Sequence, residues 1–205
     1  MSDKPTLFDI PSKHGKAWSV FVWRTRMALN YKGIPYEMIW LEFPDIAPTL
    51  KSFGLAPNPP SSYDKPYTVP TIKHPSAGYI MESNVIAREL EKLHPEPSLH
   101  LDNGYYDKAR ASVEETILCL LPELAPRIPF TLLNDGSIEY FNRTREEFLG
   151  MPLSEVLESD KAGENAWAAA RSGMEKMKAL LKENSSGPYV DGGQRHFEAC
   201  RKWMV

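Results

Sequence analysis

Short apolar runs alternate with amphipathic stretches over the first 100 residues, and longer amphipathic stretches fill the rest of the chain. The short runs are rich in β-branched and aromatic residues and are bounded by Gly, Pro or Ser, which is typical of strands. Strands are therefore expected over residues 6–10, 36–43, 68–73 and 78–81. The short gap between the last two predicts an antiparallel hairpin.

Helical periodicity connects these predicted strands. Apolar side chains recur every four residues from Trp23 to Tyr31, which predicts a helix over 19–32. A second helix is expected over 84–94, with Ser83 as its N-cap. The order β-α-β, then a loop, then β-β-α predicts a thioredoxin-like arrangement.

The remaining segments differ in composition. Residues 44–66 are rich in Pro and Ser, which predicts an irregular surface loop with one short helix near 49–53. Helical patterns dominate beyond residue 99, and the expected helices are 105–124, 138–149 and 154–183.

This pattern predicts two domains of different class. An α/β thioredoxin-like domain is expected over 1–94, followed by a Pro-rich linker over 95–98. An all-α domain is expected over 99–205.

Charge and composition exclude several function classes. The chain has 24 Lys and Arg against 27 Asp and Glu, so a net charge of -3 offers no basic field for nucleic acid. No signal peptide and no apolar run long enough for a membrane span are visible, so a cytoplasmic protein is expected. Cys119 and Cys200 form no CxxC pair, which disfavours metal binding and thiol redox chemistry.

Two motifs suggest a site for a peptide ligand. If the Val69–Pro70 bond is cis, the backbone of Val69 can offer its N–H and C=O to an extended peptide. Glu82 and Ser83 lie at a predicted helix N-terminus, which favours a carboxylate. An edge-strand proline and a plain N-cap explain each motif singly, but the two together at this spacing favour a ligand.

These motifs resemble those of the glutathione transferase superfamily, and residues 18–36 resemble its fungal-specific class, which is related to bacterial glutathione-dependent β-etherases. The resemblance implies the glutathione transferase fold, glutathione as co-substrate and a homodimer. It also implies that Ser19 is catalytic, that Val69 before cis-Pro70 pairs with the cysteinyl backbone of glutathione, and that Glu82 and Ser83 hold the γ-glutamyl end.

The physical chemistry of Ser19 agrees with this role. A hydroxyl at the first turn of a helix can donate to a thiolate, and the helix dipole favours negative charge there. The simpler role is a helix cap, and both roles are compatible. Tyr31 and Tyr36 lie at or beyond the far end of the helix, so neither replaces Ser19.

A pocket for a hydrophobic or aromatic electrophile is expected between the domains. Its candidate residues are aromatic: Trp18, Phe21, Tyr105 and Tyr106. An aromatic cluster also suits an ordinary core. Lys51 and His74 are candidates for the glycyl carboxylate of glutathione, although surface solvation is the simpler role of each.

The C-terminal end departs from the family pattern. Relatives continue from a Gly-Pro-Tyr/Phe-Val turn, here residues 187–190, into further helices, whereas this chain continues with a polar segment to residue 205. An altered or truncated end is expected, with the apolar face over 166–181 left uncovered.

Three functions remain open at this stage. The first is a transferase that uses the glutathione thiolate against an electrophilic carbon. The second is a non-catalytic protein of the same fold that binds phenolic ligands or a protein partner, and the third is a dimerisation scaffold.

Overall fold

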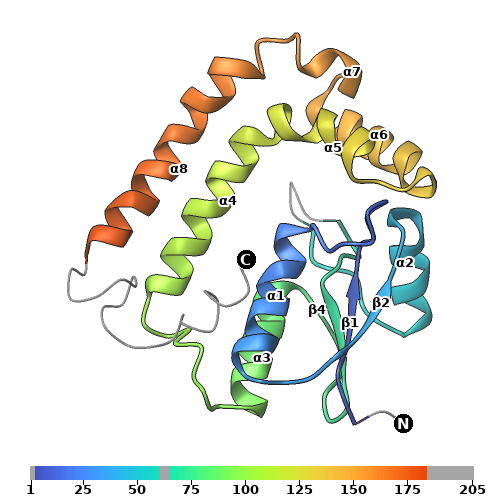
Figure 1. Ribbon diagram of the computed structural model, residues 1–205, viewed down its shortest axis with the longest axis vertical. Coiled ribbons are helices and arrows are strands. Elements are labelled where there is room, and N and C mark those ends of the chain that lie inside the picture. Colours follow the sequence, from blue (N-terminus) through green and yellow to red (C-terminus); the bar gives the residue numbers. More distant parts are fainter. Residues whose placement is uncertain (1–2, 61–64, 184–205) are drawn as a thin grey trace. The chain divides into compact units, whose positions relative to one another are not determined.

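The computed structural model describes residues 3–60 and 65–183, which form two compact units (Figure 1). The first unit runs to Leu99 and also includes Leu132–Phe141 from the helical half of the chain. The second contains residues 100–131 and 142–183. The helix α6 (Asp135–Leu149) therefore begins in the first unit and ends in the second.

A four-stranded sheet in the order β2-β1-β3-β4 forms the centre of the first unit. Its strands are β1 (Thr6–Asp9), β2 (Glu37–Trp40), β3 (Thr71–His74) and β4 (Gly78–Met81). β1 is parallel to β2 and antiparallel to β3, and β3 is antiparallel to β4. This confirms the predicted thioredoxin-like sheet and its hairpin.

Three helices cover this sheet. Figure 1 shows α1 (Val20–Tyr31) and α3 (Ser83–Leu93) on one face and α2 (Phe43–Ser52) on the other. The core between them contains these apolar side chains with 0% exposure: Leu7, Val22, Leu29, Leu50, Ile72, Ile86 and Leu90. α1 matches the predicted helix to within one residue at each end.

The prediction of an irregular loop from residue 44 was wrong for its first part, because α2 occupies Phe43–Ser52. Pro44 lies in the first turn of the helix, where an N–H group has no partner inside the helix in any case. Pro48 does lie inside the helix, but burial of Ile46 and Leu50 offsets that cost.

The second unit is helical. Its elements are α4 (Tyr105–Leu124), the 3₁₀ turn η1 (Ala125–Arg127), α5 (Ile128–Thr131), the end of α6, α7 (Leu153–Val156) and α8 (Gly163–Glu183). α4 and α8 pack together, with Leu120 against Ala166 and Ala170. None of the helices within 3–60 and 65–183 has the length and apolar character needed to cross a bilayer.

The predicted continuous helix over 154–183 was wrong, because turns separate α7 from α8. Gly163 has φ +61°, a conformation that few other residues adopt, and its N–H donates to Glu123 Oε2 at 3.1 Å. The predicted change at the C-terminal end lies outside the described residues.

Candidate active site

The strand register brings the predicted site segments to one end of the sheet. Thr71 pairs with Phe8 on one side and with Met81 on the other, so the ends of β1 and β4 lie beside the start of β3. The Glu82 N–H donates to the Pro70 carbonyl at 3.2 Å. Because α1 connects two parallel strands, it must begin at this same end, where Ser19 lies.

Ser19 is the N-cap residue of α1, but its side chain makes no capping hydrogen bond. Its carbonyl accepts the Trp23 N–H at 2.9 Å, so the backbone alone begins the helix. The residue is only 8% exposed. The hydroxyl is therefore at a helix N-terminus and is not used by the helix, as donation to a bound thiolate requires.

The Val69–Pro70 peptide bond is cis. Both residues are buried, and the ladder of β3 begins only at Thr71. The backbone of Val69 thus lies next to the sheet but outside its ladder, in a position suited to pairing with an extended peptide.

Glu82, and not Ser83, is the N-cap of α3, so the predicted cap was one residue too late. Glu82 has φ 77°, which is uncommon for a residue other than glycine, and such conformations are enriched at functional sites. Ser83 is the first helical residue and is 8% exposed. The first N–H groups of a helix lack partners within it, so this end favours an anion.

Two residues that the sequence did not single out hold the Glu82 carboxylate. Asn58 donates from Nδ2 to Glu82 Oε1 at 2.9 Å, and Thr68 donates its hydroxyl to the same oxygen. Asn58 is itself fixed by its N–H, which donates to Pro66 O at 2.8 Å. The available signals were weak: Asn58 stands between two prolines, and Thr68 directly precedes Val69.

A buried ion pair fixes α1 on the end of β1. Asp9 has 0% exposure and accepts from Arg26 Nη2 at 2.6 Å and from the Ile10 N–H at 2.7 Å. Burial raises the pKa of the Asp9 carboxyl, and Arg26 offsets this only in part. The Arg26 guanidinium also lies 5.6 Å from the Trp23 ring centroid and 5.8 Å from that of Trp40.

The structure removes His74 from the candidate site. It ends β3 at the opposite end of the sheet from Thr71, and it is buried, not solvated. Its Nε2 lies 3.1 Å from His94 Nε2, and burial lowers its pKa, with a further lowering by His94. Lys51 is exposed on α2, with its ammonium 5.4 Å from the Tyr67 ring centroid.

The four predicted pocket residues belong to different units. Trp18 donates from Nε1 to Pro11 O at 3.1 Å, and Phe21 lies under the Arg24 guanidinium at 5.1 Å. Tyr105 and Tyr106 begin α4 in the second unit. The pocket for the electrophile therefore stays a prediction.

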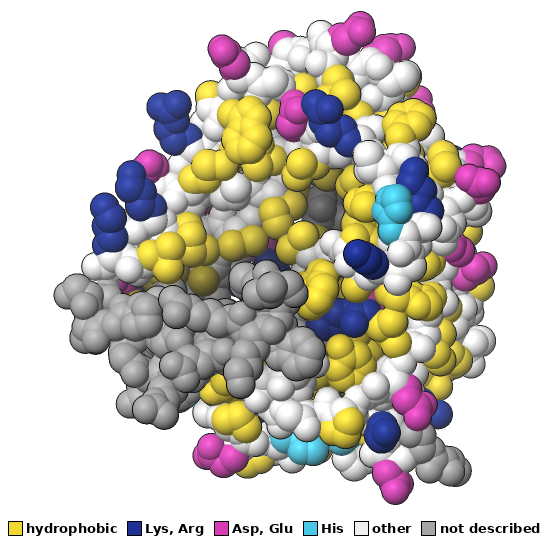
Figure 2. Space-filling view, viewed as in Figure 1, with side chains coloured by type: hydrophobic (Ala, Val, Ile, Leu, Met, Phe, Trp, Pro, Cys, Tyr) yellow, Lys and Arg dark blue, Asp and Glu magenta, His cyan; other side chains and the backbone are white. Residues whose placement is uncertain are grey.

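A groove of about 490 Å³ lies between α4 and α8. Val113, Ile117 and Leu181 are among its lining residues, and none of the predicted site residues takes part. Hydrophobic side chains along α4 and α8 are visible on the face drawn in Figure 2. Met174 in the lining is exposed, and so is Trp167 on the same helix.

Comparison with known proteins decides the family. The family model for the glutathione S-transferase N-terminal domain matches residues 18–93, and the one for the C-terminal domain matches residues 106–197. The chain belongs to the glutathione S-transferase family. Glutathione is the co-substrate of this family, as the resemblance implied.

Similar proteins support this membership in sequence and in structure. The chain is 34% identical to the glutathione S-transferase-like protein ustS of Aspergillus flavus, over 86% of this chain and 68% of that protein. A glutathione S-transferase of Ceriporiopsis subvermispora, solved in complex with glutathione, is 33% identical with a TM-score of 0.79, over 93% of this chain and 79% of that one. A glutathione transferase of Phanerochaete chrysosporium is 28% identical with a TM-score of 0.78, over 97% and 82%.

Proposed function

We propose that this chain is a glutathione transferase that binds glutathione at the end of the sheet and uses Ser19 to stabilise the thiolate of the bound tripeptide. The observation that carries the proposal is the hydroxyl of Ser19, which lies at the N-terminus of α1 and makes no capping bond. Its small exposure, 8%, excludes much of the water that competes for a thiolate.

The energy required is within reach of these groups. A free thiol titrates near about 8.5, and lowering this by about 2 units needs about 2.7 kcal/mol in favour of the thiolate. A hydrogen bond to a charged group contributes about 1.5–3 kcal/mol, and a helix N-terminus adds about 0.3–1 kcal/mol. Ser19 donates its O–H and takes no proton, so the thiol proton leaves to solvent.

The reaction then follows from the charge on sulfur. The thiolate attacks an electrophilic carbon, a C–S bond forms, and in a displacement the bond to the leaving group breaks with its electron pair. Ser19 holds the sulfur as a nucleophile without forming a covalent bond to it.

The rest of glutathione is assigned to the neighbouring groups. The Val69 backbone pairs with the cysteinyl residue, Glu82 attracts the α-amino group, and Ser83 with the N-terminus of α3 receives the γ-glutamyl carboxylate. Support comes from the Ceriporiopsis subvermispora relative, which was solved in complex with glutathione.

The second substrate is proposed to be a hydrophobic or aromatic electrophile, with β-etherase-like displacement as one reaction. Four aromatic residues are the candidates for its pocket: Trp18, Phe21, Tyr105 and Tyr106. The similar proteins from Aspergillus, Ceriporiopsis and Phanerochaete support membership of the fungal-specific class. A cytoplasmic homodimer is the expected state, as the family resemblance implies.

Ser19→Ala tests the proposal through the pKa of the bound thiol, measured from the ultraviolet absorbance of the thiolate. We expect the thiol pKa to return toward about 8.5, so that about 25-fold less thiolate remains at pH 7, with a loss of glutathione affinity of only about fourfold, as this change in pKa requires. Conjugation of an aromatic electrophile should slow by a similar factor.

The matched control is Ser52→Ala, which removes a hydroxyl that donates to Thr49 O at the far end of α2. This variant should keep the thiol pKa and the rate of the wild-type protein. A Ser19→Ala protein that retains both would overturn the catalytic role. Tight binding of glutathione by wild-type protein, with no lowering of the thiol pKa, would favour the non-catalytic binding protein.

A further inference from the structure

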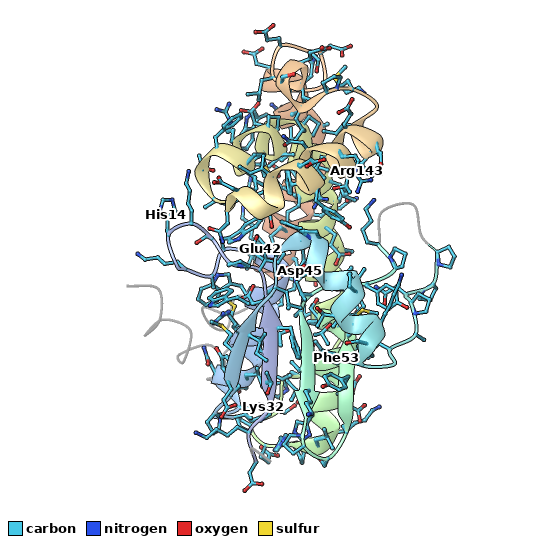
Figure 3. All side chains as sticks on the ribbon, turned by 90° about the vertical axis from the view of Figure 1, so that its right-hand side faces the viewer. His14, Lys32, Glu42, Asp45, Phe53 and Arg143 are labelled. Carbon is cyan, nitrogen blue, oxygen red and sulfur yellow. The ribbon has the colours of Figure 1, made fainter. Side chains whose placement is uncertain are left out.

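The segment Leu132–Phe141 is bound into the first unit by a partly buried cluster of hydrogen bonds. Asn134 donates from Nδ2 to Glu42 Oε1 at 2.7 Å, and Ser137 donates its hydroxyl to Glu42 Oε2. Ser137 Oγ also accepts the Phe43 N–H at 3.0 Å, and Ser137 is only 1% exposed. Glu42 lies beside α6 in Figure 3, and we call this cluster the Glu42 clamp.

A cluster of aromatic rings extends from the Glu42 clamp to Trp18, the residue before Ser19. The Phe43 ring centroid lies 5.5 Å from that of Phe141 and 6.3 Å from that of Tyr140. On its other side it lies 6.4 Å from the Trp18 ring. These distances are within the range of favourable aromatic pairs, so a shift of the Phe43 ring changes the packing of the Trp18 ring.

The loop over 10–19 has a second, independent link to the same segment. The Lys13 N–H donates to Leu132 O at 2.9 Å. Within the loop, Ser12 Oγ donates to Lys16 O at 2.7 Å, and Trp18 Nε1 donates to Pro11 O. The loop is therefore closed on itself, and it is held from outside by Leu132 and by Trp23 of α1, whose Nε1 donates to Ala17 O at 3.4 Å.

We propose that Ser137 and Glu42 are positioning residues for the reaction: through Phe43 and Trp18 they fix the hydroxyl of Ser19 where it donates to the thiolate. This inference rests on the proposed function. A charge-assisted hydrogen bond weakens steeply when its geometry is lost, and catalytic groups need placement to within about 0.5 Å. Neither Ser137 nor Glu42 is assigned a contact with glutathione.

A purely structural anchor makes a different prediction from a positioning residue. If the Glu42 clamp only stabilises the fold, its loss lowers the melting temperature and leaves the thiol pKa of bound glutathione unchanged. If the clamp positions Ser19, its loss raises that pKa, while affinity changes little because Ser83 and Val69 hold the rest of the tripeptide.

Ser137→Ala decides between these two roles in the full chain. We expect the thiol pKa of bound glutathione to rise by about 1 unit, which corresponds to a tenfold change in the ionisation constant, with glutathione affinity within about threefold. The matched control is Ser112→Ala, since Ser112 is also a buried serine, 6% exposed, and donates to Lys108 O in the second unit. The control should leave the thiol pKa unchanged.

Two further proteins separate the possible failures. Phe43→Leu keeps an apolar side chain and the backbone N–H but removes the ring contacts of Phe43. It should also raise the thiol pKa, and it therefore tests the inference even if Ser137→Ala does not fold. Wild-type protein and Ser19→Ala report on the proposed function in the same titration. This inference alone is overturned if wild type lowers the thiol pKa of bound glutathione and Ser19→Ala raises it, while the folded clamp variants leave it at the wild-type value. If wild type does not lower the thiol pKa, both proposals are overturned.

Discussion

At the scale of single residues, the carboxylate of Asp9 depends on its partners because water cannot reach it. Arg26 supplies Nε at 3.0 Å and Nη2 at 2.6 Å, and Ile10 supplies its N–H. Arg26→Met keeps most of the apolar packing but leaves a buried carboxylate without its charged partner. We expect a loss of about 3–5 kcal/mol in unfolding free energy at pH 7, measured by urea denaturation.

The pH dependence of Arg26→Met follows from the raised pKa of Asp9. A group whose pKa is raised on folding contributes stability below its unfolded pKa, near 3.8, and loses it as pH rises through the folded pKa. Without Arg26 that pKa rises further, so the deficit of the variant should shrink as pH falls. The double variant Asp9→Asn, Arg26→Met should recover stability at pH 7, and an additive loss instead would contradict the ion-pair account.

Some residues of the proposed site can be located from the sequence and others cannot, for a physical reason. The proposed roles of Val69 and Pro70 depend on the backbone, and that of Ser19 depends on its place at a helix start, so local patterns point to them. Asn58 and Glu42 act through side chains that meet partners 24 and 92 residues away. No local pattern encodes such contacts.

At the scale of elements, the α4–α8 pair depends on the absence of a side chain at Gly173. A Cβ there would lie 2.4 Å from Thr116 Oγ1 and 2.8 Å from Ser112 O. The Thr116 hydroxyl is tied to Ser112 O at 2.8 Å and cannot simply turn away. Gly173→Ala gains about 1 kcal/mol of helix propensity but costs about 1–3 kcal/mol of overpacking, so net destabilisation by up to about 2 kcal/mol is expected.

Gly136→Ala is the matched control, because Gly136 also lies in a helix and a Cβ there meets nothing within 4 Å. It should leave the melting temperature equal or higher, while Gly173→Ala lowers it. Equal effects of the two substitutions would show that Gly173 is not a close-packing position. These helices also show what the sequence can and cannot predict. Hydrophobic periodicity located α4, but it gives no signal for the positive φ of Gly163, which lies between α7 and α8.

At the scale of the whole molecule, the chain order of the two halves does not coincide with the two compact units. Residues 132–141 lie among helices in sequence and belong to the first unit in space. Hydrophobic periodicity located α6, but it could not reveal which unit the start of α6 packs into, because that depends on contacts with Glu42 and Phe43.

This composition of the first unit predicts that a fragment of residues 1–99 is not a stable domain. The fragment lacks Leu133 and Phe141, each 2% exposed, and fully burying such side chains contributes about 1.5–3 kcal/mol each. A loss of about 3–6 kcal/mol is large against the usual 5–15 kcal/mol of a domain, so the urea midpoint of the fragment should fall well below that of the first unit in the full chain.

A second fragment, in which residues 132–141 follow Leu99 through a Gly/Ser linker, should recover much of the lost urea midpoint, as followed by tryptophan fluorescence. If both fragments unfold at the same urea concentration, Leu132–Phe141 adds nothing to the first unit, and its role in holding the loop of Ser19 loses its structural basis.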